Sequence, residues 1–239
     1  MKIAAAFSLF MASASAFGPF NTGKSAPTEL KVASMNGWAP NDAEFAYGLP
    51  GSIDPIADFD PLGLAEKADF GTMMKYREAE LQHGRVAMLA AIGMLVTEEP
   101  VEFHPLFESY NKDIGPAIRH LDEVRAVSPF FFEILAVIIG SLEFNRALKG
   151  WLPPDEAEGN NLLKDSYFPG DVGFDPLGLK PEDPEEFLEL HTKELQNGRV
   201  AMLGAAGMIA QELVNGKEIF VNLGVAQDRF DPSLLPVQF

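Results

Sequence analysis

The chain has 239 residues, a formal net charge of −17 and no cysteine. This length is sufficient for one or two domains. The lack of cysteine excludes disulfide bonds and thiolate metal sites, and the acidic balance without basic patches argues against nucleic acid as a partner.

The first 34 residues have the composition of a leader. MKIAAAFSLFMASASAFGPF combines a lysine, an apolar run too short to stay in a membrane as a helix, and an ASA site before Phe17. The following residues hold Lys24 and Lys31, one acid and several Ser and Thr, as in a transit segment. We expect a signal peptide at about 1–16 and a transit segment at about 17–34. This order resembles the two-part leader of plastid proteins in algae with secondary plastids, and plain secretion is the alternative.

The remaining residues, 35–239, are expected to form one all-α domain, because no strand pattern competes with the helical ones. Loop-like stretches rich in Gly, Pro and Asp precede the first and the last helical patterns. Stop signals follow the three patterns, namely Glu-Glu-Pro, a Gly with a nearby Pro, and Asn-Gly. We expect helices near 72–97, 130–148 and 184–214.

Length and composition point in different directions on whether these helices cross a membrane. None contains 18 uninterrupted apolar residues, as is typical of buried helices in a soluble protein. However, the first and third are long enough to span ~30 Å of hydrocarbon at ~1.5 Å per residue. Small residues also recur at helical spacing, as in membrane helix pairs. They are Gly84, Ala87, Ala91, Gly198, Ala201 and Ala205.

One sequence unit occurs twice in the chain. ELQHGRVAML at 80–89 returns as ELQNGRVAML at 194–203, and 12 of 15 positions agree when each stretch is extended to residues 94 and 208. Upstream, FDPLGL at 59–64 returns unchanged at 174–179. A duplicated loop and helix is typical of two helices related by a two-fold axis.

The repeated charges favour a crossing of the two copies. Glu80 and Arg85 are about 140° apart around a helix, too far to pair, and Glu194 and Arg199 have the same spacing. If the copies cross about a two-fold axis, Glu80 can meet Arg199 and Glu194 can meet Arg85. Because an unpaired charge in lipid is costly, we expect this crossed arrangement.

The repeated helices also carry possible metal ligands. Glu80 and His83 lie three residues apart, as do Glu194 and Asn197, and all four can offer a lone pair to a metal. A di-iron bundle uses Glu-x-x-His, but it needs two such copies and two more glutamates. A soluble metal-carboxylate bundle enzyme is therefore an alternative. A magnesium ion held by four ring nitrogens needs one axial ligand, so His83 and Asn197 can differ if each serves its own centre.

These motifs resemble the light-harvesting chlorophyll-binding protein family over about 45–225. The resemblance rests on the two Glu-x-x-His/Asn-Gly-Arg-x-Ala-Met motifs, on FDPLGL before each, and on Glu143-x-x-Arg146 in the middle helix. YGLPGSIDPIADFDPLGLAEKAD and YREAELQHGRVAML look closest to fucoxanthin chlorophyll a/c proteins of diatoms and brown algae. The family implies an all-α membrane protein with three transmembrane helices, the first and third crossed about a pseudo-two-fold axis.

The resemblance also implies a set of ligands and loops. Arg146 could pair with Glu143 in its own helix, and Glu133 could be an acid favoured by the helix dipole. The implied axial ligands of chlorophyll magnesium are Glu80, His83, Glu194, Asn197, Gln211, Glu143 and Glu133, with Arg85, Arg199 and Arg146 as their charge partners. The implied carotenoid head-group loops are Asp60, Pro61, Leu62, Asp175, Pro176 and Leu177, which also suit helix-entry turns.

The implied cofactors are chlorophyll a, chlorophyll c, fucoxanthin and diadinoxanthin. The implied function is an antenna without catalytic residues, in the plastid thylakoid membrane beside other antenna proteins, that passes excitation to photosystem I or II. A photoprotective quencher is the alternative within the same fold. It would use Glu98, Glu99 and Glu102, which otherwise form a solvated acidic loop.

Four positions do not match the ligand pattern of the family. Many relatives read Asn-Leu-x-x-His after the third helix, whereas Ala226 stands in the place of that histidine. That pigment site is therefore in doubt. His104, His120 and His191 match no ligand of the family, and we expect them in loops or at the surface.

Overall fold

The computed structural model describes residues 35–98, 101, 103, 115–157, 159 and 162–226, so the expected leader at 1–34 lies outside the described residues. Within these ranges the chain is helical and contains no strand, although two isolated bridges join Met35 to Trp38 and Trp151 to Leu163.

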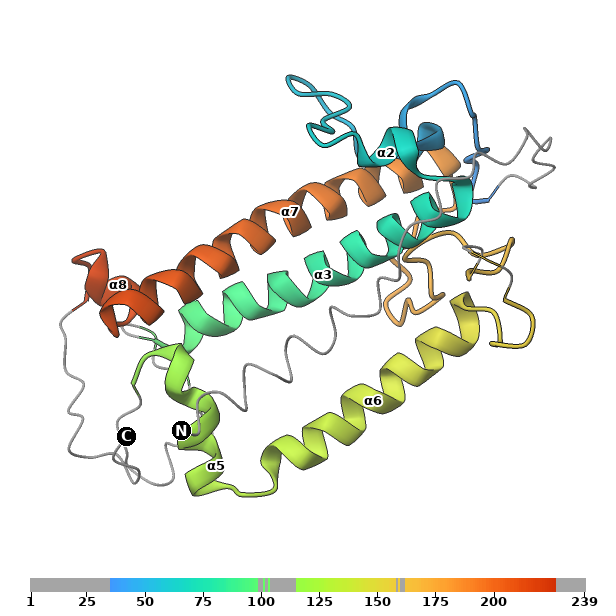
Figure 1. Cartoon of the computed structure of the whole chain (residues 1–239). Helices are drawn as coiled ribbons and strands as arrows, with labels where there is room; N and C mark the ends of the chain where they lie inside the picture. Colours follow the sequence, from blue (N-terminus) through green and yellow to red (C-terminus); the bar gives the residue numbers. More distant parts are fainter. Residues whose placement is uncertain are drawn as a thin grey trace. The chain divides into compact units, whose positions relative to one another are not determined.

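Three long helices dominate the described residues (Figure 1). They are α3 (Phe70–Thr97), α6 (Phe131–Gly150) and α7 (Pro184–Asn215), near the ranges expected from the sequence. Their ends follow from local chemistry. The Asp69 carboxylate accepts a hydrogen bond from the Thr72 amide at the start of α3, and Asp183 does the same for the Glu186 amide in α7.

Among the described residues, five short helices connect or extend the long ones. The eight-residue α5 lies between the first two helices expected from the sequence, where no helix was expected, and it contacts α6. The short helices are η2 (Phe45–Gly48), α2 (Leu64–Lys67), η3 (Ala117–Arg119), α5 (His120–Val127) and α8 (Ile219–Asn222).

Helices α3 and α7 pack against each other through a pair of glycines (Figure 1). A Cβ atom added to Gly84 would lie 3.0 Å from the Gly198 Cα, and one added to Gly198 would lie 2.9 Å from the Gly84 Cα. Leu81 and Leu195 are buried three residues before these glycines. The small-residue pattern therefore brings the two backbones into contact, as proposed for it from the sequence.

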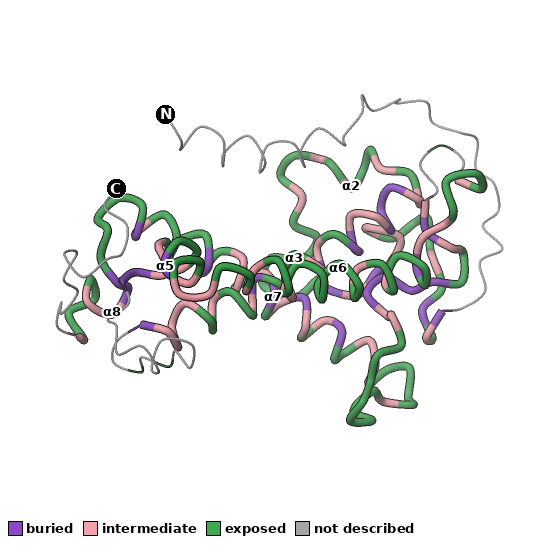
Figure 2. Tube along the Cα trace, turned by 90° about the horizontal axis from the view of Figure 1, so that it is seen from below, coloured by how far each residue is buried: buried purple, intermediate pink, exposed green. Residues whose placement is uncertain are grey.

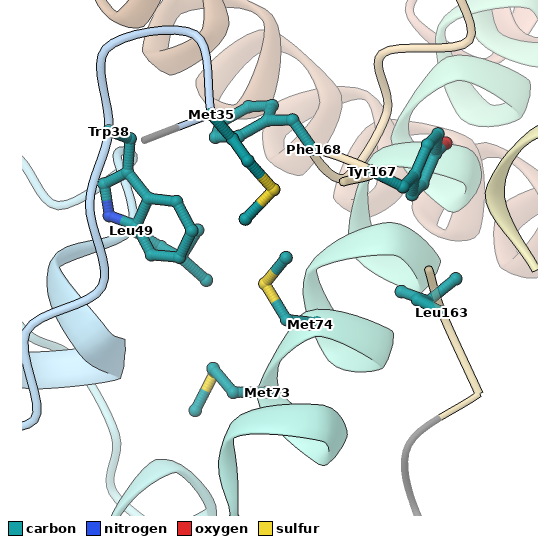
Figure 3. Close-up of a cluster of buried hydrophobic side chains, with 8 residues drawn as sticks. All are labelled: Met35, Trp38, Leu49, Met73, Met74, Leu163, Tyr167 and Phe168. Carbon is teal, nitrogen blue, oxygen red and sulfur yellow. The ribbon is translucent and has the colours of Figure 1, made fainter. Parts of the chain in front are cut away.

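A compact apolar cluster joins distant loops to the start of α3 (Figure 3). Trp38 packs edge-on against Phe168, with ring centroids 5.9 Å apart, and donates from Nε1 to the Gly48 carbonyl. Burying one such large apolar side chain stabilises a fold by about 1.5–3 kcal/mol. The members are Met35, Trp38, Leu49, Met73, Met74, Leu163, Tyr167 and Phe168.

Exposed residues lie along the long helices (Figure 2), and many of them are apolar. In α6, Ile134, Val137 and Leu142 are each more than half exposed, which is unusual for a helix in water. By length and hydropathy, no single helix among the described residues qualifies as a membrane span. The pair Ala117–Val127 and Phe131–Gly150, bent by 110°, qualifies when taken together.

Candidate functional site

The repeated charges form two reciprocal ion pairs between α3 and α7. Arg85 Nε lies 2.7 Å from Glu194 Oε1, and Arg199 Nε lies 2.7 Å from Glu80 Oε1. All four side chains are half-buried. The structure thus brings together the residues that the spacing had assigned to each other, and each helix neutralises the carboxylate of the other.

Two Pro-Gly turns each accept a further hydrogen bond from one of these arginines. Arg199 Nη1 donates to the Gly51 carbonyl at 2.7 Å, and Arg85 Nη2 donates to the Gly170 carbonyl at 3.0 Å. Each turn precedes one long helix but binds the arginine of the other. A Cβ at Gly51 would lie 2.8 Å from Leu195 Cδ1, and one at Gly170 would lie 2.6 Å from Leu81 Cδ1. Both glycines also have a positive φ, 121° at Gly51 and 84° at Gly170, which other residues rarely adopt, so both turns favour glycine.

The sequence analysis missed these turns, although a signal was present. YGLPG precedes the first FDPLGL and YFPG precedes the second, so the repeat begins earlier than the FDPLGL loops. The spacing between turn and helix differs in the two copies, which hides the match from a search at one fixed period.

His83 and Asn197 are exposed and are oriented in the same way. His83 Nδ1 lies 2.7 Å from the Ala79 carbonyl, and Asn197 Nδ2 donates to the Lys193 carbonyl at 2.9 Å. Because a carbonyl only accepts, Nδ1 carries the proton of the neutral imidazole, and its Nε2 retains a lone pair. The Asn197 Oδ1 likewise remains available. Histidine and asparagine thus use an equivalent backbone anchor to present an electron pair.

Glu143 and Arg146 belong to a network that links α6 to α3. Arg146 donates to Glu143 Oε2 at 2.9 Å and to Glu78 Oε1 at 2.7 Å, while Gln82 Nε2 donates to Glu143 Oε1 at 2.9 Å. Both oxygens of Glu143 are therefore engaged, although each keeps a second lone pair. The pairing of Arg146 with Glu143 that the spacing allowed is present.

Glu78 is the buried centre of this network. It also accepts hydrogen bonds from the Gly170 amide at 2.6 Å and from the Tyr167 hydroxyl at 3.1 Å. Burial, reinforced by the Glu78 charge, raises the pKa of the Tyr167 hydroxyl well above its usual value. The repeat does not single out Glu78, because Thr192 stands at its place in the second copy.

Gln211 and Glu133 lie apart from the crossing. Gln211 is half-buried in α7, and its Nε2 has no hydrogen-bond partner within the part of the chain that the structure describes. Glu133 is exposed in the first turn of α6 and lies 3.4 Å from Arg125. Ala226 ends the described tail beyond α8 and offers no side-chain ligand.

Asp60 and Asp175 close matching turns at the two FDPLGL loops. Asp60 accepts from the Leu64 and Ala65 amides at 3.0 and 2.7 Å, and Asp175 accepts from the Leu179 and Lys180 amides at 3.0 and 2.8 Å. These backbone hydrogen bonds, led by that from Leu64, lower the pKa of Asp60. Those from Lys180 and then Leu179 do the same for Asp175.

The other residues of the two loops point outward. Both aspartates serve their own turns, while their apolar neighbours stay accessible. The exposed apolar side chains are Phe59, Leu62, Phe174 and Leu177.

The expectation for the unmatched histidines was wrong for His191. It is buried in α7 against Phe168 and Phe187, with ring centroids 5.1 and 6.1 Å away. The burial depends on Phe168, a loop residue whose proximity no local pattern reveals. His120 opens α5, with its Nε2 3.0 Å from the Gly115 carbonyl, and His104 lies outside the described residues.

The reading of Glu98 as part of a solvated loop was also wrong. Glu98 and Glu212 are 1% and 2% exposed, and each accepts one backbone hydrogen bond, from Ile219 and Ile118 respectively. Their Oε1 atoms have no hydrogen-bond partner among the described residues. Glu99 and Glu102 lie outside the described residues. Backbone amides from two other elements thus stabilise the burial of these acids.

Residues 45–213 match the family described as chlorophyll A-B binding protein. The chain belongs to this family. Over 181 residues it is 46% identical to a fucoxanthin-chlorophyll a-c binding protein of Isochrysis galbana, covering 74% of this chain and 82% of that protein. It is 48% identical to light-harvesting complex stress-related protein 1 of Chlamydomonas reinhardtii, covering 75% and 70%. Chlorophyll a-b binding protein 4 of Arabidopsis thaliana is 34% identical, covering 84% and 78%.

As a member of this family the chain is a light-harvesting, chlorophyll-binding protein with a helical membrane fold. Its residues fit such a pigment. A ligand atom on each of His83 and Asn197 suits a magnesium ion that needs one axial ligand, and exposed apolar helix surfaces suit the ring. By contrast, no group of three His, Cys, Asp or Glu in the described ranges could hold a bare metal ion.

Proposed function

We propose that the chain is a thylakoid antenna in which α3, α6 and α7 span the membrane, with α3 and α7 crossed about a pseudo-two-fold axis. The reciprocal ion pairs, the Gly84–Gly198 contact and the two Pro-Gly turns support this arrangement. The exposed apolar surface of α6 supports its contact with lipid and pigment rather than water.

The observation that carries the proposal is the shared anchoring of His83 and Asn197. In both side chains one nitrogen is hydrogen-bonded to the carbonyl four residues earlier. This contact holds the other polar atom, His83 Nε2 or Asn197 Oδ1, outward as an axial ligand. We assign chlorophyll magnesium ligands by the same criterion of an available lone pair. They are Glu80, His83, Glu194, Asn197 and Gln211, with Glu143 and Glu133 as further ligands.

The arginines make the carboxylate ligands neutral as pairs. Arg199 pairs with Glu80, Arg85 with Glu194 and Arg146 with Glu143. A pigment bound to a charged carboxylate in a low-dielectric site would otherwise carry an uncompensated charge.

The proposed pigments are chlorophyll a, chlorophyll c, fucoxanthin and diadinoxanthin. The first three are supported by two relatives that are fucoxanthin-chlorophyll a-c binding proteins. The outward apolar residues of the two FDPLGL loops suit carotenoid ends, with Asp60 and Asp175 holding the turns. When bound, the pigments absorb light and pass excitation to other antenna proteins and to photosystem I or II.

Pigment content after reconstitution tests this function. His83→Leu should remove one chlorophyll per protein and leave a foldable chain, because a neutral ligand is lost without stranding a charge. His83→Gln, which retains a lone pair, is the matched control and should keep that chlorophyll. If both variants hold the full number, His83 is not a ligand.

A second candidate function is photoprotective quenching, favoured by the buried pair Glu98 and Glu212. Both are buried with Oε1 atoms that have no hydrogen-bond partner among the described residues, and protonation would remove the cost of holding a charge away from water. Stress-related relatives add support. Fluorescence lifetime should then shorten at pH 5 relative to pH 7 in the natural protein but not in Glu98→Gln with Glu212→Gln. An equal lifetime at both pH values would contradict the quenching function and leave only the antenna function.

A further inference from the structure

The two carboxylate sites that the repeat makes alike differ in their surroundings. Glu80 has a guanidinium at each oxygen: Oε1 lies 2.7 Å from Arg199 Nε, and Oε2 lies 3.3 Å from Arg77 Nε. Arg77 is 7% exposed and donates to the Pro50 carbonyl, so it is held in place. One negative charge therefore sits between two positive ones.

Glu194 has only one such partner. Its Oε1 pairs with Arg85, and its Oε2 has no hydrogen bond or ion pair within the described part of the chain. The place of Arg77, three residues before the glutamate, is taken by His191. That ring lies between Phe168 and Phe187, and its Nε2 has no partner among the described residues. Burial without a carboxylate contact favours the neutral imidazole.

We propose that Arg77 and His191 make the two glutamate sites unequal, with Glu194 the stronger and Glu80 the weaker axial ligand of magnesium. This inference rests on the proposed ligand roles of both glutamates. A magnesium ion competes with Arg77 for Oε2 of Glu80 and meets a net positive environment there. At Glu194 the corresponding oxygen is available and the ion pair is neutral. Arg77 is thus a positioning residue that sets how firmly a chlorophyll is held.

The size of the effect follows from one unit charge. At a separation of several Å and an effective dielectric constant of about 20, one charge changes an equilibrium by on the order of tenfold or more. We therefore expect chlorophyll at Glu80 to be released about tenfold faster than chlorophyll at Glu194.

Release of chlorophyll a from the reconstituted full chain into excess detergent tests this difference. Arg77→Gln removes the charge and should slow the fast phase of release about tenfold. Arg77→Lys keeps the charge and should retain the fast phase. In the other copy, His191→Arg should add a second fast phase, whereas His191→Gln should not. Arginine next to Glu194 has a carboxylate partner, as Arg77 has in α3, so this variant provides a second test if Arg77→Gln fails to fold.

Assignment of the phases uses paired ligand variants. The fast phase, with its absorption difference spectrum, should vanish in Glu80→Leu with Arg199→Leu and persist in Glu194→Leu with Arg85→Leu, because leucine offers no lone pair. If each pair loses one chlorophyll but Arg77→Gln and Arg77→Lys release pigment at the same rate, the inference about Arg77 is overturned. If neither pair loses chlorophyll, the proposed ligand roles themselves are wrong.

Discussion

At the scale of single residues, Arg85 and Arg199 occupy equivalent positions in the repeat. Their removal would nevertheless leave the partner glutamates with different numbers of positive neighbours. Without Arg199, Glu80 still has Arg77 at 3.3 Å, whereas without Arg85 no guanidinium of the described residues remains beside Glu194. Loss of one member of a buried pair costs about 3–5 kcal/mol. The half-buried positions of these residues place both losses toward the lower end of that range.

We therefore predict that Arg85→Leu destabilises the pigmented complex more than Arg199→Leu. The reason is that it leaves Glu194 without a counter-charge. Glu194→Gln should recover part of the loss in Arg85→Leu, while Glu80→Gln should not. Thermal midpoints of the single and double variants measure this. Rescue of Arg85→Leu by Glu80→Gln would mean that the pairing lies within one helix.

Asp171 gives a pH-dependent prediction at the same scale. Burial alone would raise its pKa, but hydrogen bonds from Lys180 and Asn36, at 2.6 and 2.8 Å, lower it below its usual value. A lowered folded-state pKa stabilises the fold above the unfolded-state pKa of ~4, and this contribution is lost as the pH falls through the folded value.

Asp171→Asn should accordingly lower stability by about 1 kcal/mol at pH 7, the scale of a partly exposed ion pair. The difference from the natural chain should shrink below pH 3. Chemical unfolding at both pH values is the measurement. Asp165→Asn, an exposed neighbour, is the control and should change little at either pH. A difference that grows on acidification would contradict the assignment.

At the scale of elements, the α3–α7 crossing depends on two glycines among several in these helices. Gly84→Ala should destabilise by about 1–3 kcal/mol, because its Cβ would lie 3.0 Å from the Gly198 Cα and the backbones would have to separate. Gly93→Ala and Gly207→Ala are matched controls with no atom within 4 Å of the new Cβ. They should stabilise by about 0.5–1 kcal/mol through helix propensity. A lower thermal midpoint for Gly84→Ala and higher midpoints for the two controls would establish that the helices cross at Gly84.

The attachment of α6 to α3 yields a second prediction for elements. Arg146→Leu leaves the carboxylate of Glu78 buried without its counter-charge, so we expect a loss of about 3–5 kcal/mol. Arg125→Leu removes a pair with the exposed Glu133 and should cost about 0–1 kcal/mol. The yield and thermal midpoint of pigmented complex compare the two. Equal effects would show that Glu78 does not depend on Arg146.

At the scale of the whole molecule, the repeated motif predicted contacts between the two copies. Features that depend on contacts with distant segments could not be predicted. The duplicated motif was enough to propose partners for Arg85 and Arg199 across two helices. Burial of His191 could not be foreseen, because it requires a loop residue brought close by the fold. The eight-residue α5 was missed for a similar reason: a helix this short is marginal alone. It begins directly after η3, where Glu212 of α7 accepts the Ile118 amide.

The two Pro-Gly turns have a consequence for the order of assembly. Arg85 needs Gly170 and Glu194, and Arg199 needs Gly51 and Glu80, so neither copy completes its interactions alone. These partners are 85 to 148 residues apart. Contacts this distant form slowly because a long loop must first close. During synthesis Arg85 of the first helix therefore lacks its partner Glu194 until most of the chain has been made.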